Sequence, residues 1–273
     1  VAMMDAGLNQ LSAHYPPSQV ASLRGAASLP LVLVWALATG GIAPLLRVRW
    51  SLHLLRGVLG VAMMATFVFA VSKLPLSTTY SIFFVAPLLI TALSVPVLGE
   101  KVGPRRWAAI VVGLIGVIVL LRPTGEGMGS LAALAVLVAA VMYAVSAITV
   151  RILARTDSTQ SMMVWLMVMI ALGAGALAWP DWVPIRREDV WLIAGIGLAG
   201  AFGQYAITEA FRMGEASAIA PLEYTALVWG VLFDLTFWGV LPDAVTWIGA
   251  SIIVVSGLYL IRREKVHAEA EHP

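Results

Sequence analysis

The stretch "VPVLGEKVGPRRW", from Val95 to Trp107, separates two long apolar runs and carries four charged residues. A second stretch, "TFWGVLPDAVTW" from Thr236 to Trp247, has a similar pattern about 140 residues later. In each, a Gly follows an apolar run, a Pro comes next, and a Trp opens another apolar run. The second stretch has no basic residue. The two stretches therefore predict a duplicated chain whose halves meet different surroundings at this point.

The composition is that of a membrane protein. Of the 273 residues, 60% are hydrophobic and 12% are charged, and the mean hydropathy is +0.93. A soluble domain carries about 25% charged residues, and a soluble protein of this size could not bury so much apolar surface. We therefore expect an all-α integral membrane protein whose main partner is the lipid bilayer.

The same composition disfavours several other classes of protein. A net charge of +2 is too small to indicate a nucleic-acid partner. The chain has no cysteine, so it can form neither a disulfide framework nor a thiolate metal site. Its four histidines stand at helix ends or in the tail, and no two have the helical spacing of metal ligands. We expect no metal, no cofactor and no enzymatic activity.

Apolar runs long enough to cross a bilayer follow one another with short linkers. A spanning helix needs about 20 mostly apolar residues. The chain opens at Val1 inside such a run, so we expect the first helix to lack its beginning. Ten membrane helices are predicted, the first ending near residue 12 and the others covering about 18–42, 53–72, 77–98, 107–121, 129–150, 160–179, 190–211, 215–239 and 245–261.

A constant shift of 140 residues aligns the two halves of the chain without a gap. Apolar matches arise by chance in membrane proteins, so the Gly, Trp and Arg matches carry the argument. We expect two five-helix repeats, residues 1–123 and 124–273. The matched pairs include Gly57 with Gly197, Gly60 with Gly200, Gly99 with Gly239, Trp107 with Trp247 and Arg122 with Arg262.

Because five is an odd number, the two repeats must cross the membrane in opposite orientations. Cytoplasmic loops collect Lys and Arg. With the C-terminus in the cytoplasm, the inner loops hold twelve of the 17 basic residues and the outer loops hold four, while Arg24 falls within a span. We therefore expect a multi-pass protein of the inner membrane with a cytoplasmic C-terminus. Inverted repeats that enclose a binding site are typical of transporters.

Several segments resemble the EamA family of the drug/metabolite transporter superfamily. They are "LRG", "PLLITALSVPVLGEKVGPRRWAAIVVGLIGVIVLLRP", and "APLEYTALVW" with "WGVLPDAVTWIGASIIVVSGLYL". The resemblance covers essentially the whole chain and includes a G-E-x-x-x-x-x-x-W block. It implies a ten-helix inverted-repeat carrier with a central cavity, closest to the exporters of amino acids and related metabolites. Family members often carry a Lys before the Leu-Ser that here is Leu11-Ser12, and this chain has Asn9 there.

An ionisable residue inside a span is costly and is a functional candidate by default. Glu223 lies well within the span 215–239, two residues after Pro221. It could accept a proton, bind a substrate ammonium group, or make a structural hydrogen bond. Asp234, near the outer end of the same span, is expected to be a solvated residue at the mouth.

Asp5 and Arg24 belong to adjacent helices and lie at a similar depth. They could form an ion pair with a structural or a gating role. If Arg24 faces the cavity instead, its planar guanidinium could clamp a substrate carboxylate.

Aromatic and polar side chains inside spans complete the predicted binding residues. Rings with a polar tip suit a cavity for an amphipathic solute, although helix packing is the simpler explanation for any one of them. Tyr80 and Phe84 share one face of a helix, and Gln204 stands one turn from Thr208. The predicted set is Tyr80, Phe84, Tyr143, Trp165, Gln204, Tyr205, Tyr224 and Trp229, with Asn9, Arg24 and Glu223.

The motif "GIGLAG", Gly195 to Gly200, has the letters of a dinucleotide-binding fingerprint. That fingerprint requires a preceding strand, whereas these glycines stand in an apolar helix, where small residues allow close helix packing. No "GxxxxGK" loop is present, which excludes ATP hydrolysis by this chain.

The sequence predicts a secondary transporter that exports small amphipathic metabolites by alternating access, as a monomer or homodimer. Amino acids, aromatic ones included, are the favoured cargo, and transport could be proton-coupled or facilitative. The alternative is an importer of a larger planar nutrient, such as a flavin or a nucleoside-like compound, on the same fold.

Overall fold

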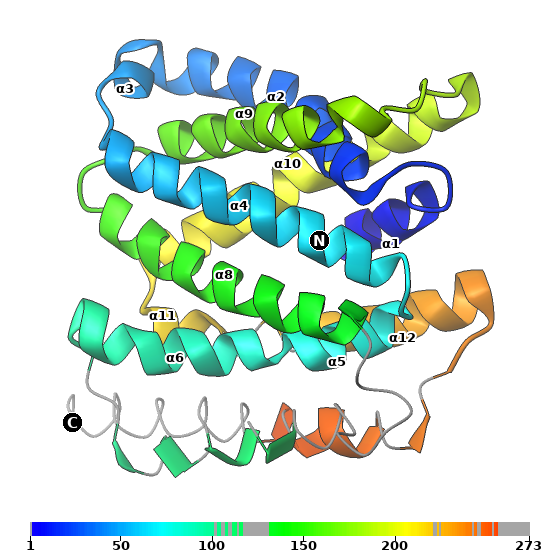
Figure 1. Cartoon of the computed structure of the whole chain (residues 1–273). Coiled ribbons are helices and arrows are strands. Elements are labelled where there is room, and N and C mark those ends of the chain that lie inside the picture. The colour runs from blue at the N-terminus through cyan, green and yellow to red at the C-terminus, as the bar shows by residue number, and fades with distance from the viewer. Residues whose placement is uncertain are drawn as a thin grey trace. The chain divides into compact units, whose positions relative to one another are not determined.

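The computed structural model (Figure 1) describes residues 2–100, 131–220 and 225–241, together with 103–104, 107–108, 111–113, 115–116, 223, 243–244, 247–252 and 254–255. Within these ranges every regular element is a helix, as the sequence predicts. The elements are α1 (Ala2–Leu11), α2 (Pro17–Gly40), α3 (Ala43–Leu46), α4 (Trp50–Val71), α5 (Leu76–Phe83), α6 (Val85–Leu98), α8 (Leu131–Leu153), α9 (Thr159–Ala178), η1 (Trp179–Asp181), η2 (Arg187–Asp189), α10 (Val190–Met213), α11 (Ala216–Ile219), α12 (Thr225–Phe233) and η4 (Asp234–Trp238).

Six of the described helices are long and apolar enough to cross a membrane. They correspond to six of the predicted spans. The predicted spans 107–121 and 245–261 lie mostly outside the described residues, and 215–239 is divided into α11, α12 and η4. The six are Pro17–Gly40, Trp50–Val71, Leu76–Leu98, Leu131–Leu153, Thr159–Asp181 and Arg187–Met213.

The chain folds into two compact units that do not follow the sequence halves. Unit 1 comprises Val1–Leu74 and Thr149–Met213, and unit 2 comprises Pro75–Ile148 and Gly214–Pro273. Each unit therefore takes helices from both predicted repeats.

Unit 1 is centred on the antiparallel pair of α2 and α9 (Figure 1). Near the start of α2, the Ser22 hydroxyl donates to the Ala171 carbonyl over 2.8 Å. At the other end of the pair, Gly40 lies against Gln160 at the start of α9. Because the Ser22 hydroxyl is bonded within the protein and needs no water, its contact with Ala171 can lie inside the hydrocarbon region.

Glycine pairs bring two further helices onto this centre. In α4, Gly57 and Gly60 pack against Met169 and Leu166 of α9. In α10, a Cβ on Gly197 would lie 2.7 Å from the backbone of Ala27 in α2. The matched glycines of the two halves thus make corresponding contacts, and "GIGLAG" lies inside α10 as the sequence predicts.

One end of unit 1 is closed by polar contacts between the α1–α2 turn and the segment before α10. The Gln19 amide, fully buried, donates to the Val183 carbonyl over 2.6 Å and accepts from the Val183 N–H over 2.9 Å. The Tyr15 hydroxyl donates to Asp189 over 2.6 Å and accepts from the Arg186 N–H over 3.0 Å. Burial and the Asp189 carboxylate raise the pKa of Tyr15, so it stays a neutral donor.

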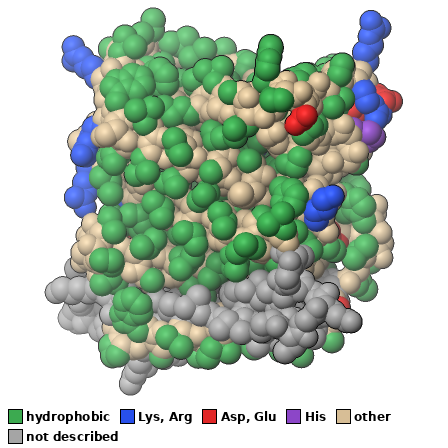
Figure 2. Space-filling view, viewed as in Figure 1, with side chains coloured by type: hydrophobic (Ala, Val, Ile, Leu, Met, Phe, Trp, Pro, Cys, Tyr) green, Lys and Arg blue, Asp and Glu red, His purple; other side chains and the backbone are tan. Residues whose placement is uncertain are grey.

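The outer surface of the helices is apolar. On the face drawn in Figure 2, hydrophobic side chains cover the middle, and most Lys and Arg side chains stand at its edges. Large exposed residues such as Val34, Val58 and Leu172 are between 68% and 70% exposed. Such a surface suits lipid rather than water.

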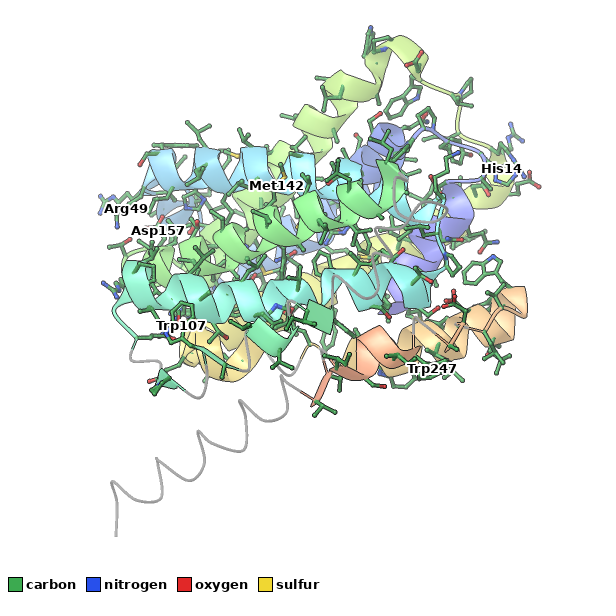
Figure 3. The ribbon with its side chains drawn as sticks, turned by 60° about the horizontal axis from the view of Figure 1, so that its bottom comes forward. His14, Arg49, Trp107, Met142, Asp157 and Trp247 are labelled. Atoms are coloured by element: carbon green, nitrogen blue, oxygen red, sulfur yellow. The ribbon has the colours of Figure 1, made fainter. Side chains whose placement is uncertain are left out.

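Unit 2 contains the two turns quoted at the start. Gly99 and Gly239 both end a helix in the left-handed conformation, with φ of 75° and 64°. In both turns the N–H of the residue after the Gly bonds the carbonyl six residues earlier: Glu100 donates to the Ser94 carbonyl and Val240 donates to the Asp234 carbonyl. This is the Schellman geometry, and it recurs at the 140-residue shift. The described residues Trp107 and Trp247, which follow these turns, lie far apart in unit 2 (Figure 3).

We predict that Gly197→Ala destabilises the protein by about 1–3 kcal/mol, because the added methyl group overpacks the α10–α2 contact. The matched control is Gly195→Ala in the same helix, where a Cβ meets nothing within 4 Å. Thermal unfolding in detergent should give a lower Tm for the first variant and an unchanged or higher Tm for the second, because Ala is the better helix former. Equal Tm values for the two variants would contradict the packing role of Gly197.

Candidate functional site

The candidate site is the pairing of Tyr143 with Glu223 in unit 2. Tyr143 stands in the middle of α8, and Glu223 lies between α11 and α12 in 3-10 conformation. The Tyr143 hydroxyl donates to Oε1 of Glu223. The Phe83 ring, at the end of α5, lies 5.4 Å from the Tyr143 ring. Two predicted residues that are 80 positions apart are thus brought together, with an aromatic neighbour.

The adjoining wall of the site is the contact between α5 and α12. Tyr80 is 4% exposed and packs against Gly230, where any side chain would collide with its ring. Phe84 is buried at the junction of α5 and α6. Trp229 is 52% exposed and contacts the Phe233 ring at 6.3 Å, so it lies on the surface of α12. The predicted residue Tyr224 lies outside the described residues.

Asp234 is not the solvated residue that the sequence suggests. It is 2% exposed and opens the π-helical segment η4. Its two oxygens accept the N–H groups of Leu76, over 3.0 Å, and Ser77, over 2.6 Å. The prediction was wrong because the start of α5, 157 residues away in sequence, supplies donors at this depth. The carboxylate caps α5.

A second carboxylate caps the start of α11. Oε1 of Glu100, from the G-E block, accepts the Ala216 N–H over 3.2 Å. Asp234 follows α12 and caps the beginning of the span Leu76–Leu98, whereas Glu100 follows the end of that span. The segment from Ala216 to Asp234 therefore runs antiparallel to α5 and α6, and the two Schellman turns lie at opposite ends of unit 2.

Three predicted residues occupy the interior of unit 1. Arg24 is 5% exposed and Asp5 is 3% exposed, and Asp5 lies close enough to act on the guanidinium charge. Arg24 Nε donates to the Met4 sulfur over 3.1 Å, while its Nη1 has no partner among the described residues. The Asn9 amide donates to the Val71 carbonyl over 2.5 Å and so ties α1 to α4.

The remaining predicted residues also belong to unit 1 and pack between helices. The Trp165 indole N–H donates to the Leu45 carbonyl over 2.8 Å. Tyr205, 38% exposed, lies 5.2 Å from the Trp35 ring. The Gln204 amide donates to the Thr208 hydroxyl over 3.1 Å. These contacts match the packing alternative for Trp165 and Tyr205.

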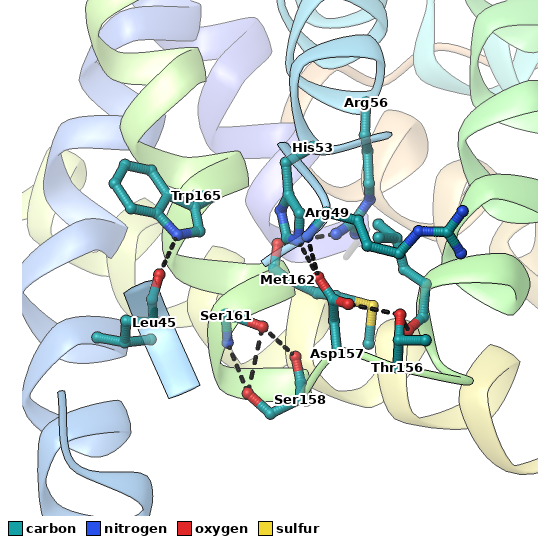
Figure 4. Close-up of polar contacts among 11 residues, drawn as sticks. Leu45, Arg49, His53, Arg56, Thr156, Asp157, Ser158, Ser161, Met162 and Trp165 are labelled. Carbon is teal, nitrogen blue, oxygen red and sulfur yellow. Dashed lines mark hydrogen bonds and ion pairs between the residues drawn. The ribbon is translucent and has the colours of Figure 1, made fainter. Parts of the chain in front are cut away.

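The sequence reasoning missed a buried polar cluster around His53 and Asp157 in unit 1 (Figure 4). The imidazole Nε2 lies 2.8 Å from Oδ2 of Asp157, and the two side chains are 1% and 2% exposed. Asp157 also accepts from the Arg49 N–H over 3.1 Å and the Thr156 hydroxyl over 2.6 Å. Figure 3 places Arg49 and Asp157 at the same end of the unit. No spacing rule links His53 to a residue 104 positions away.

This cluster joins the start of α4 to the turn before α9, at the end of unit 1 opposite the Tyr15 and Gln19 contacts. Burial by itself disfavours the charged carboxylate and would raise the pKa of Asp157. The hydrogen bonds from Thr156, Arg49 and His53 more than offset burial, so the pKa lies below the ordinary value of 3.8. Asp157 is therefore an ionised anchor at neutral pH. Among the described residues, no three His, Asp or Glu side chains form a metal-binding group.

We predict that Asp157→Asn lowers stability at pH 7 by about 1.5–3 kcal/mol, the value of hydrogen bonds to a charged group. Because the folded pKa is depressed, the contribution of Asp157 is complete above the unfolded value of 3.8 and is lost as pH falls through the folded value. Thermal unfolding in detergent between pH 7 and pH 3 should therefore show the variant approaching the wild type only below about pH 4. Asp181→Asn, at an exposed aspartate, is the control. A constant difference at every pH would contradict this account.

Comparison with known proteins gives consistent results along the whole chain. The profile of the EamA-like transporter family matches residues 2–122 and 130–263. A riboflavin transporter of Vibrio cholerae is 32% identical over 94% of this chain and 86% of its own length. A pseudopaline exporter of Pseudomonas aeruginosa is 26% identical over 97% and 93%. An S-adenosylmethionine uptake transporter of Rickettsia prowazekii is 28% identical over 82% and 76%.

A solved crystal structure has the same fold. It superimposes with a TM-score of 0.71 at 22% sequence identity, covering 96% of this chain and 95% of the other. At this identity the likeness concerns the fold alone.

Proposed function

The chain belongs to the EamA-like transporter family, and we propose that it exports small amphipathic metabolites, with amino acids, aromatic ones included, as the main cargo. That it is a multi-pass membrane protein related to small-molecule transporters is established by the family match and the named relatives. Cargo class and direction are the proposal. The observation that carries it is the hydrogen bond between Tyr143 and Glu223 beside an aromatic wall.

A carboxylate at a helix interruption suits a cargo with an ammonium group. Glu223 lies between the end of α11 and the start of α12, in 3-10 conformation, and its side chain is half-buried. The carboxylate can bind an ammonium group directly, or it can accept a proton during the transport cycle. The Tyr143 hydroxyl stabilises the ionised form by donating to it.

The wall beside this pair suits the rest of an amphipathic cargo. Tyr80 and Phe83 present rings from α5. The hydroxyls of Ser77 and Thr79, on the same helix, are buried and have no hydrogen-bond partner among the described residues. Rings and unused hydroxyls together can hold a solute that has both apolar and polar parts. The relatives named for riboflavin and S-adenosylmethionine carry cargo of such mixed character.

We further propose that the whole chain forms ten helices in two inverted five-helix repeats and works by alternating access. The recurrence of the Schellman turn at Gly99 and Gly239 supports the repeat. The antiparallel course of the two turn-bearing segments supports the inversion. The distribution of basic residues supports an inner-membrane location with a cytoplasmic C-terminus. Export is supported by the nearly full-length match to a pseudopaline exporter.

The test is flux of labelled phenylalanine in liposomes that contain the purified protein, with unlabelled threonine or riboflavin as competitors. We expect uptake that threonine reduces. Glu223→Gln should lower the rate about tenfold or more, because it removes the negative charge that would pair with an ammonium group or accept a proton, while it keeps an acceptor oxygen for Tyr143. Tyr143→Phe should have a smaller effect in the same direction. The control is Glu188→Gln, which removes a carboxylate that is 66% exposed.

A proton gradient separates the two modes of transport. Flux that requires the gradient and disappears in Glu223→Gln indicates proton coupling, and flux without the gradient indicates a facilitator. Absence of phenylalanine flux from folded protein, or competition by riboflavin alone, would overturn the amino acid assignment and direct the search to larger planar solutes.

A further inference from the structure

Two acidic side chains cap two helix starts of unit 2, one at each of its opposite ends. Asp234 accepts the N–H groups of Leu76 and Ser77 at the start of α5. Glu100 accepts the N–H of Ala216 at the start of α11. The first N–H groups of a helix have no partner within the helix, and a carboxylate there also complements the positive end of the helix dipole.

The caps exchange partners between the two halves of the chain. Glu100, directly after Gly99, supplies the acid for the start of α11, and Asp234, five residues before Gly239, supplies the acid for the start of α5. At the 140-residue shift, Asp234 matches Ser94 and Glu100 matches Val240. Each half therefore has one acidic residue in its Schellman motif, but at different positions. Asp234 provides the carbonyl that accepts the long-range turn bond, whereas Glu100 provides the N–H that donates it.

Each cap holds a segment that leads directly to the candidate site. From the capped Leu76 and Ser77, α5 continues to Tyr80 and Phe83, which contact Gly230 and Tyr143. From the capped Ala216, α11 continues for one turn and then reaches Glu223. Both capped segments therefore reach Tyr143 of α8: Phe83 of the first contacts its ring, and Glu223 of the second accepts its hydroxyl.

We propose that Asp234 and Glu100 are positioning residues for cargo binding. Asp234 fixes α5 so that its rings lie beside Tyr143, and Glu100 fixes the segment that presents Glu223. The inference rests on the proposed function of the Tyr143–Glu223 site and adds two residues that do not touch it. The Glu of the G-E block thereby has a role: it caps a helix of the other half of the chain.

The alternative is that the two acids serve folding alone. Both accounts predict some loss of stability when a cap is removed, because capping side chains stabilise helices. Only the positioning account predicts weaker cargo binding in protein that remains folded. The apparent KM therefore distinguishes the accounts, together with the mobility of each capped segment.

The experiment compares Asp234→Asn, Asp234→Ala and Glu100→Ala with the wild-type full chain in liposomes and in detergent. Asn keeps the shape of Asp and one acceptor oxygen, so it should retain part of the cap, whereas Ala retains none. We expect KM for phenylalanine to rise about fivefold in Asp234→Asn, from the loss of part of a cap, and further in Asp234→Ala. The control is Asp181→Asn, at an exposed aspartate.

Amide hydrogen exchange gives a readout that does not depend on any cargo. Asp234→Asn should speed exchange from Leu76 to Phe83, and Glu100→Ala should speed it from Ala216 to Glu223, while α2 in unit 1 stays unchanged. Folded variants with wild-type exchange in these segments and a wild-type KM would overturn the inference. Absence of phenylalanine flux in the wild type would count against the proposed function alone, because the exchange data still decide whether the two acids hold these segments.

Discussion

A helix that stops inside a bilayer leaves backbone N–H and C=O groups that water cannot reach, and each must find a partner within the protein. This chain interrupts its helices in unit 2 at the junction of α5 and α6 and again between α11 and α12. Asp234 accepts N–H groups at the start of α5, and Glu100 accepts the N–H at the start of α11. Schellman turns at Gly99 and Gly239 satisfy carbonyl groups at the far ends of the same two segments. Glu223 is half-buried and lies on the segment between the capped Ala216 and the Schellman turn at Gly239.

The same exchange between halves holds unit 1 together. Matched glycines of α4 and α10 pack on α9 and α2, so each half supplies the small residues that the other half covers. Polar contacts then close the two ends of the α2–α9 pair, with Gln19 and Tyr15 at one end and His53 with Asp157 at the other. Each compact unit thus combines helices from both predicted repeats.

Features that depend on local sequence or on the repeat could be predicted. The six described spans, the helical state of "GIGLAG" and the equivalence of Gly99 and Gly239 follow from hydropathy and from one constant shift. Glu223 is predicted as a site residue because an ionisable group inside a span is costly, and Tyr143 because a ring with a polar tip suits an amphipathic solute, but the sequence does not predict their pairing. Features that depend on distant partners were missed. The sequence predicts a solvated Asp234 because no local pattern reveals the N–H groups of Leu76 and Ser77, and it gives no role to His53 because its partner Asp157 is 104 residues away.

The central claim is that the two turns after Gly99 and Gly239 face opposite sides of the membrane. Because the chain has no cysteine, single cysteines can be placed at Gly103 and at Leu241, which are both exposed. The measurement is labelling of intact cells with a membrane-impermeant maleimide, repeated after permeabilisation. The account predicts that Leu241→Cys is labelled in intact cells and Gly103→Cys only after permeabilisation. Labelling of both positions from the same side would contradict the inverted arrangement on which the exchange of caps depends.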